Sequence, residues 1–263
     1  MNMTFPRPPL APARSGSGRI RAVLKLMRPR VTGMRARFSL GFGLICLGAC
    51  NAWPQQFEAA PVHIPAPTVN EPLAHTPGTD SLTIAGGCFW GVQGVFQHVK
   101  GVRDAVSGYA GGTRDTAAYP IVSSGTTGHA ESVEISFDPS VITLGELLRV
   151  YFSVVHNPTE LNRQGPDQGT QYRSAIFYKN EEQKRIAESY IAQLDQGKYF
   201  REKIATQLTP LKSFFPAEGY HQDYATLHPD SGYISHFDLP KIKHLQEFYP
   251  DLYRPNPVLV SAH

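Results

Sequence analysis

The hydrophobic pattern becomes regular near Ser81 and opens with a strand, a turn and a helix. Leu82 and Ile84 alternate with polar positions as in a short strand, and two glycines then interrupt the pattern. Helical spacing follows up to Gly101, where a glycine can end a helix, through Phe89, Val92, Val95, Phe96 and Val99.

Later alternating segments predict further strands. Period-two patterns favour strands over 102–112 and 131–139, and similar runs over 171–178 and 203–208 predict two more. In the segment 131–139, one face carries Val133, Ile135 and Phe137.

Two later helices carry recognisable start signals. Thr143 and Glu146 form a capping box ahead of the apolar run 144–155. Asn180 begins the next helix, which Gly197 ends and whose apolar face is Ile186, Ala187, Tyr190, Ile191 and Leu194.

The order of these elements, βαββαβ, predicts the fold class. It favours an α/β (α+β) fold, a two-layer sandwich with a ferredoxin-like core. Beyond Pro210 the chain is aromatic, rich in histidine and without clear periodicity, so we expect a long irregular C-terminal wrap. Residues 81–263 are therefore expected to form one folded domain.

Charge separates the N-terminal region from the rest. Residues 1–37 hold nine of the 25 Lys and Arg and no Asp or Glu, which leaves 16 basic residues against 22 acidic ones. The folded part has no basic footprint for nucleic acid, so we exclude nucleic-acid binding.

From Met34 the sequence resembles an export signal. Two arginines precede about a dozen apolar or small residues, too few for a permanent membrane span. The residues 47–50 are similar to a bacterial lipobox, in which Cys50 would be lipidated. The alternatives are an ordinary signal peptide with an incidental cysteine and an organellar presequence, because residues 1–33 are rich in arginine and free of acids.

These features predict the domain organisation and the location. We expect a leader over 1–50 with translation from Met34, and a Pro-rich, extended and poorly ordered tether over 51–80. The protein is then exported, as a periplasmic protein or a membrane-anchored lipoprotein, with an organellar or cytoplasmic location as the alternative.

Cys88 lies at the turn between the first strand and the first helix. Backbone N–H groups and the positive end of the helix dipole meet there, which favours a thiolate nucleophile. Gly86 and Gly87 allow a ligand to approach the backbone. The alternative is a buried cysteine that acts as a small hydrophobic residue.

Glu131 has the same strand parity as the apolar face of 131–139. Alternation therefore puts its carboxyl group at the end of the core-facing row. Burial would raise its pKa and keep it protonated near neutral pH, as a general acid requires. The preceding loop would carry His129 beside it, and the alternative is a strand end where Glu131 already meets water.

Four motifs in this order resemble the peptide methionine sulfoxide reductase A family: GGCFWG, TTGHAE, QGTQYRSAIFY and EGYHQDY. The resemblance runs from about residue 81 to about residue 235. It implies an oxidoreductase, a peptide-methionine (S)-S-oxide reductase. Such an enzyme reduces methionine S-sulfoxide, free or in proteins, and repairs proteins under oxidative stress.

The resemblance also implies catalytic residues. Cys88 matches the nucleophile that attacks the sulfoxide sulfur and ends as a sulfenic acid, and Glu131 matches the acid that protonates the oxygen. Tyr119 and Tyr172 match tyrosines that hydrogen-bond this oxygen. Asp167 matches a carboxylate that assists near the cysteine.

Four further residues match the family's substrate pocket. Phe89 and Trp90 would form the apolar site for the S-methyl group, and Tyr224 and Tyr233 match further pocket tyrosines. Helix periodicity favours the core for Phe89 more than for Trp90.

The implied chemistry needs no metal or organic cofactor, since a thiol, an acid and phenol donors suffice. The histidines show no short ligand spacing such as HxxxH, so we expect no metal site. The expected partners are oxidised proteins, peptides and free methionine sulfoxide, and we expect a monomer.

The resemblance departs from many family members in one respect. They carry a second cysteine directly after the Gly-Tyr that matches Gly232-Tyr233, and this chain has Ile234 there. We therefore expect an external thiol reductant, such as thioredoxin or a related dithiol protein, to reduce the Cys88 sulfenic acid. If Cys50 is not lipidated, it could instead act as the resolving thiol.

Two other functions fit the residues less well. A cysteine hydrolase would use Cys88 as nucleophile, His129 or His221 as base and Asp167 to orient it, but the sequence signature of a known thiol protease is lacking. A lipid-anchored binding module without catalytic activity would use the cysteine structurally.

Overall fold

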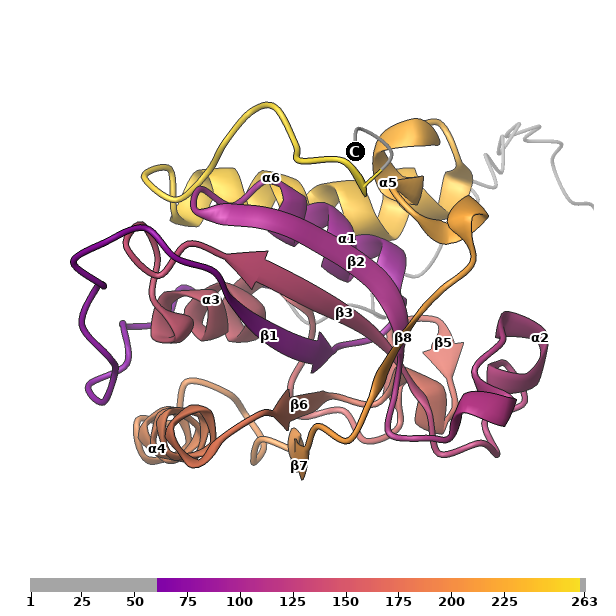
Figure 1. Cartoon of the computed structure of the whole chain (residues 1–263), viewed down its shortest axis with the longest axis horizontal. Coiled ribbons are helices and arrows are strands. Elements are labelled where there is room, and N and C mark those ends of the chain that lie inside the picture. Colours follow the sequence, from indigo (N-terminus) through magenta and orange to yellow (C-terminus); the bar gives the residue numbers. More distant parts are fainter. Residues whose placement is uncertain (1–60, 261–263) are drawn as a thin grey trace, which may run out of the picture. The chain divides into compact units, whose positions relative to one another are not determined.

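The computed structural model describes residues 61–260, and a curled six-stranded sheet forms its centre (Figure 1). The strand order is β7-β6-β1-β3-β2-β8, and neighbouring strands are antiparallel except for the parallel pair β6 and β7. The strands β4 and β5 pair separately. In chain order the strands are β1 (Asp80–Ala85), β2 (Val102–Ala110), β3 (Ala130–Phe137), β4 (Arg163–Gln164), β5 (Asp167–Gln168), β6 (Ala175–Tyr178), β7 (Gln207–Pro210) and β8 (Phe214–Pro216).

Helices connect and cover these strands. The helix α1 packs against β2 and β3, α6 packs against α1, and α4 packs against α3 and β6. The α-helices are α1 (Phe89–Gln97), α2 (Tyr119–Val122), α3 (Leu144–Val150), α4 (Glu181–Gln196), α5 (Tyr224–Leu227) and α6 (Leu239–Phe248). The 3-10 helices are η1 (Arg114–Thr116), η3 (Thr170–Tyr172) and η4 (Gly219–His221), and the π-helical segments are η2 (Tyr151–Val155) and η5 (Ile234–Asp238).

The mixed α/β class is confirmed. The four strands of the expected βαββαβ order correspond to β1, β2, β3 and β6, which lie next to one another as β6-β1-β3-β2. The ferredoxin-like core stays a prediction, because β7 and β8 widen the sheet on both sides beyond four strands.

Both predicted helix starts are present. Thr143 Oγ1 accepts a hydrogen bond from the Glu146 backbone N–H at 3.2 Å, and Asn180 Oδ1 accepts one from that of Gln183 at 2.8 Å. Each bond satisfies an N–H that the first helical turn leaves without a partner inside the helix. The helix that starts at Thr143 continues as the π-helical segment η2 rather than as a regular α-helix.

The expected irregular C-terminal wrap is only partly right. The strand β8 joins the edge of the sheet beside β2, and the ten-residue helix α6 precedes a last irregular segment over residues 249–260. The apolar pattern of α6 is hard to recognise because one of its buried positions is Lys241. A proline at its start, Pro240, was the available signal.

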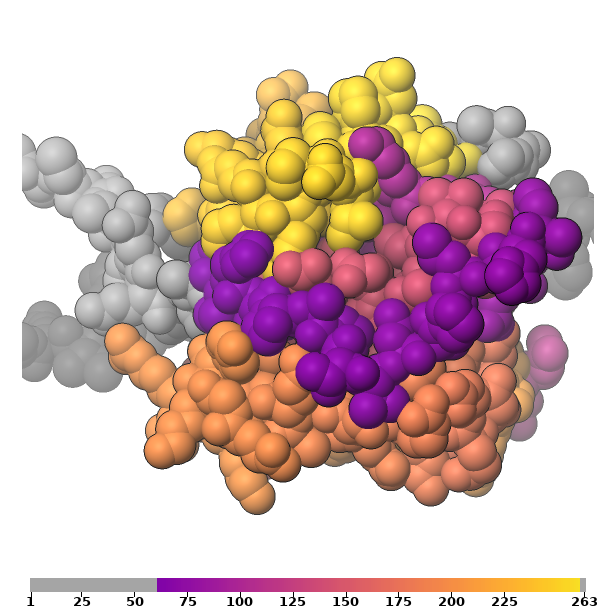
Figure 2. Space-filling view, turned by 90° about the vertical axis from the view of Figure 1, so that its left-hand side faces the viewer, coloured from indigo at the N-terminus to yellow at the C-terminus, as the bar shows by residue number. Residues whose placement is uncertain are grey.

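The expected poorly ordered tether is wrong for residues 61–79, the part that the structure describes. Ile64 is fully buried, the Val62 N–H donates to the Ser153 carbonyl at 3.1 Å, and Tyr190 donates to the Pro65 carbonyl at 2.7 Å. Figure 2 shows the segment in indigo across one face of the molecule, between the yellow C-terminal segment and the orange segment that contains α4. Bonds to distant helices, rather than a local repeat, hold this segment in place. A repeating apolar pattern is therefore not needed in its own sequence.

The predictions for the leader lie outside the described residues. They concern the start at Met34, the signal peptide, the lipidation of Cys50 and residues 51–60 of the tether. Within residues 61–260, no helix is both long and apolar enough to cross a membrane.

Candidate active site

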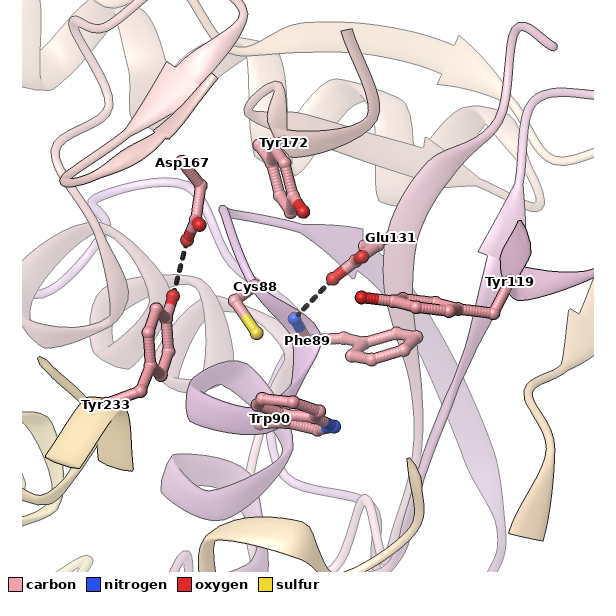
Figure 3. Close-up of a pocket in the computed structure, with 8 residues that line it drawn as sticks. All are labelled: Cys88, Phe89, Trp90, Tyr119, Glu131, Asp167, Tyr172 and Tyr233. Atoms are coloured by element: carbon pink, nitrogen blue, oxygen red, sulfur yellow. Dashed lines mark hydrogen bonds between the residues drawn. The ribbon is translucent and has the colours of Figure 1, made fainter. Parts of the chain in front are cut away.

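A pocket of about 200 Å³ lies at the N-terminal end of α1 (Figure 3). The residues that line it come from α1 and from segments spread over more than a hundred positions of the chain. They are Cys88, Phe89, Trp90, Tyr119, Glu131, Asp167, Tyr172 and Tyr233. The structure therefore brings together all but one of the catalytic and substrate-binding residues predicted from the sequence, the exception being Tyr224.

The backbone around Cys88 follows from the strand, the glycines and the helix. Cys88 is the N-cap residue of α1, and its side chain is 9% exposed. Gly87 has φ +90°, and a Cβ there would lie 2.7 Å from Gln164 Cβ. Only glycine fits this turn without strain, so the turn presents the sulfur to the pocket.

The surroundings of Cys88 favour the neutral thiol, whereas the helix terminus alone led to the expectation of a thiolate. Burial raises the pKa of Cys88 well above its ordinary value, and the carboxyl groups of Glu131, Asp238 and Asp167 raise it further. A hydrogen bond from the Trp90 backbone lowers this pKa but does not outweigh burial. The helix terminus was visible in the sequence, whereas the three carboxyl groups come from distant segments.

Glu131 lies in the core-facing row of β3, as its parity predicted. It is 2% exposed, which excludes a strand end in water, and its Oε2 accepts a hydrogen bond from the Phe89 backbone N–H at 3.1 Å. Burial raises the pKa of Glu131 to about 8, although the Phe89 N–H lowers it. Its carboxyl group is therefore protonated near neutral pH and can donate a proton.

Three tyrosines bring neutral phenol groups to the same space. Burial, followed by the charge of Glu131, raises the pKa of Tyr119 and of Tyr172, so both keep their protons. The Tyr233 hydroxyl donates a hydrogen bond to Asp167 Oδ2 (Figure 3). Burial raises the pKa of Asp167. The hydrogen bond from Tyr233 and the charge of Lys241 lower this pKa by a smaller amount, so it stays above its ordinary value.

Aromatic rings form the apolar wall. Trp90 stacks on Tyr224 with 3.8 Å between ring centroids and 12° between planes, and meets Tyr233 edge-on at 6.1 Å. The Trp90 indole N–H donates to His221 Nδ1 at 3.2 Å. Phe89 is almost fully buried against Tyr109, so it belongs to the core as well as to the pocket.

Tyr224 is the predicted site residue that the structure places beside the pocket rather than in its lining. It was expected to contact the substrate as a pocket tyrosine, but the residues lining the pocket do not include it. Its ring instead supports Trp90 through the stacking contact. The sequence motif located Tyr224 near the site without showing whether it faces the substrate or a neighbouring side chain.

The two histidines proposed as hydrolase bases have other partners. His129 Nδ1 accepts from the Gly112 N–H at 3.3 Å, and its Nε2 lies 3.0 Å from the Thr113 carbonyl, to which it donates. His221 Nδ1 accepts from Trp90. Neither histidine lines the pocket. The geometry therefore disfavours the cysteine hydrolase.

The sequence analysis missed residues that orient the pocket. Glu218 accepts hydrogen bonds from the Tyr109 hydroxyl at 2.8 Å and from the Tyr119 backbone N–H at 2.9 Å. Glu218 and His221 both belong to the EGYHQDY motif, so a signal for them existed. Among residues 61–260, no group of three or more His, Cys, Asp or Glu could hold a metal ion.

Comparisons with known proteins agree with this arrangement. A family model described as "Peptide methionine sulfoxide reductase" matches residues 80–251. The chain is 60% identical over 186 residues to "Peptide methionine sulfoxide reductase MsrA 2" of Mesorhizobium japonicum, which covers 71% of this chain and 95% of that relative. A relative of the same name from Synechocystis is 48% identical over 190 residues, covering 72% of this chain and 89% of the relative.

Two solved structures are similar as well. The reduced form of Mxr1 from Saccharomyces cerevisiae has a TM-score of 0.53 and 36% identity, covering 62% of this chain and 95% of that chain. Methionine sulfoxide reductase A of Corynebacterium diphtheriae has a TM-score of 0.50 and 31% identity, covering 67% of this chain and 91% of that chain.

Proposed function

Because the chain belongs to the peptide methionine sulfoxide reductase A family and is an oxidoreductase acting on methionine sulfoxide, we propose that Cys88 accepts the sulfoxide oxygen as a sulfenic acid. An external thiol then returns Cys88 to the thiol. One observation carries this proposal: a buried cysteine and a buried, protonated carboxyl group line the same pocket.

The pocket favours one orientation of the substrate. The S-methyl group packs against Trp90, the oxygen points to Glu131, Tyr119 and Tyr172, and the sulfur faces Cys88. The sulfoxide sulfur is a stereocentre. Separate contacts for its methyl group, its oxygen and the attacking cysteine therefore distinguish the two epimers. The family's activity assigns the S epimer, free or in oxidised proteins, so we propose that the enzyme repairs proteins under oxidative stress.

Neutral hydrogen-bond donors favour charge development on the oxygen. The phenols of Tyr119 and Tyr172 keep their protons, and the Glu131 carboxyl group is neutral below about pH 8. Donors held in a buried site stabilise a developing oxyanion more strongly than water does. Glu131 completes the transfer by giving its proton to the oxygen.

The oxygen transfer balances without another reactant. The Cys88 sulfur attacks the sulfoxide sulfur while Glu131 protonates the oxygen, and the thiol proton restores the Glu131 carboxyl group. The attack forms an S–S bond between Cys88 and the substrate. The oxygen then moves to the Cys88 sulfur as a hydroxyl group, so the substrate S–O bond and this S–S bond break and a Cys88 S–O bond forms. The substrate sulfur gains two electrons and the Cys88 sulfur loses two, which gives the thioether and a sulfenic acid.

The sulfenic acid must then be reduced from outside the described domain. Cys88 is the free cysteine of residues 61–260, and the position after Gly232-Tyr233 is a fully buried isoleucine. A first thiol forms a mixed disulfide with Cys88 and releases water, and a second thiol breaks it. We propose a thioredoxin-like dithiol protein as the donor of both thiols.

A single-turnover experiment tests this proposal. The full chain is mixed with one equivalent of N-acetyl-methionine S-sulfoxide and dimedone, without reductant, and the R epimer serves as the matched control. We expect one thioether per enzyme and a dimedone adduct on Cys88 with the S epimer alone. Thioether without a Cys88 adduct, or a Cys50–Cys88 disulfide that outpaces dimedone, would contradict direct external resolution.

The same sample separates the alternative functions. A peptide ester added in place of the sulfoxide is cleaved by a cysteine hydrolase and left intact by a reductase. A binding module without catalytic activity changes neither compound.

A further inference from the structure

The first turn of α1 has no side chain at the position that faces back toward Cys88. Cys88 is the N-cap, and the third helical residue is Gly91. In a capping box, the side chain of this third residue reaches back to the N-cap. A Cβ on Gly91 would lie 2.1 Å from Asp238 Oδ1 and 3.0 Å from Lys241 Nζ. Two side chains from the C-terminal region therefore fill this space.

Asp238 and Lys241 form a buried ion pair. Lys241 Nζ lies 3.2 Å from Asp238 Oδ1, and the residues are 8% and 0% exposed. Asp238 ends η5 and Lys241 lies in the first turn of α6. Burying both charges is costly, and a buried carboxylate that loses its cation is costlier still. Packing alone would favour apolar side chains here.

The pair stands beside a pocket crowded with carboxyl groups. Glu131 from β3, Asp238 from η5 and Asp167 from β5 all disfavour negative charge on Cys88. Tyr119, Tyr172 and Tyr233 face the same space. Lys241 brings a cation to this acidic site, where its charge lowers the pKa of Asp167.

We propose that Lys241 is a positioning residue for the reaction: it holds Asp238 against Gly91 and offsets the negative charge of the site while Cys88 attacks. Asp238 brings a carboxylate from a distant segment against the first turn of α1, which has no acidic residue of its own. Lys241 neutralises the Asp238 carboxylate, so that this carboxylate does not oppose negative charge on the Cys88 sulfur. The inference rests on the proposed role of Cys88 as the nucleophile.

The test compares Lys241→Met, Asp238→Asn and the double variant with the wild type as full chains. Lys243→Met is the matched control, because Lys243 lies on the same helix with a 73% exposed side chain. The readouts are the pH dependence of Cys88 alkylation by iodoacetamide, followed on the Cys88 peptide, and the single-turnover rate of sulfoxide reduction. Thermal unfolding reports on folding.

Lys241→Met should raise the alkylation midpoint by on the order of one pH unit and slow the single turnover by roughly tenfold, since it removes a cation beside developing negative charge. Asp238→Asn should lower the midpoint. The double variant should return the midpoint close to the wild-type value, and Lys243→Met should change neither readout.

Three outcomes overturn the proposal. They are an unchanged midpoint in a folded Lys241→Met, an unchanged or raised midpoint in Asp238→Asn, and a double variant whose midpoint stays as high as that of Lys241→Met. If Lys241→Met does not fold, the other two variants decide. Alkylation needs no sulfoxide, so shifted midpoints in a protein that reduces no sulfoxide would sink the proposed function and leave standing the effect of Lys241 and Asp238 on the Cys88 thiol alone.

Discussion

Residues 80–178 and residues 211–260 build the same pocket in different ways. The first region contributes Cys88 at the start of α1, Glu131 near the start of β3 and Tyr172 at the end of η3, all set by local sequence. The second contributes mainly side chains that orient others, such as His221 against Trp90 and Glu218 against Tyr119. The groups proposed to react are therefore placed by local sequence, while their orientation depends on segments far along the chain.

Tyr233 is the exception that links the two regions. It lines the pocket from the C-terminal side and donates to Asp167 in β5. Substitutions in the first region should therefore abolish or slow the chemistry. In the second region, substitutions of side chains that support the pocket wall, such as Tyr224, should weaken substrate binding while chemistry continues, and the buried ion pair of Asp238 and Lys241 is the expected exception.

The largest effect is expected from Cys88→Ser. Serine is nearly isosteric with cysteine, so the fold should persist, but a hydroxyl is a poor nucleophile toward sulfoxide sulfur. Turnover with a thiol reductant should fall below a few per cent of the wild-type rate. A folded variant that keeps more activity would show that Cys88 is not the nucleophile.

Glu131→Gln should slow the single turnover by about 10²–10⁴-fold, the usual contribution of a positioned acid. The pH dependence gives a second readout. Because the pKa of Glu131 is raised to about 8, its proton is present below that pH and is lost as the pH rises through it. The wild-type rate should therefore fall above about pH 8.

The direction of this change separates Glu131 from Cys88. If ionisation of the Cys88 thiol limited the reaction, the rate would rise with pH, because the pKa of Cys88 lies well above its ordinary value. The Glu131→Gln variant should lose the fall above about pH 8. An unchanged rate in this variant would mean that another group donates the proton.

The contrast between locally placed groups and groups from distant segments also decides what could be predicted from the sequence. Val133, Ile135 and Phe137 repeat with the strand period, so β3 and the burial of Glu131 followed from local pattern. The protonated thiol of Cys88 did not, since it depends on Asp167 and Asp238 as well as on burial.

The C-terminal region hid its structure for a related reason. Lys241 occupies a buried position of α6, so the helix lacks the apolar face by which a helix is recognised. Its ion pair with Asp238 lies against Gly91, a contact that links α6 to α1 and has no trace in local sequence. The family motif that contains Tyr224 located this residue near the site but did not show that its ring stacks on Trp90.

The smallest effect is expected from Tyr224→Leu. The substitution removes a ring that stacks on Trp90 at 3.8 Å, and an aromatic pair contributes about 0.5–1.5 kcal/mol beyond its buried area. The KM for a peptide sulfoxide should rise by roughly two- to tenfold while kcat changes less, because the role we propose for Trp90 is to bind the methyl group rather than to take part in proton transfer. Tyr224→Phe keeps the stacked ring and should behave like the wild type. If Phe impairs KM as much as Leu does, the hydroxyl of Tyr224 contacts the substrate directly, and its place would be with the reacting region rather than with the residues that orient it.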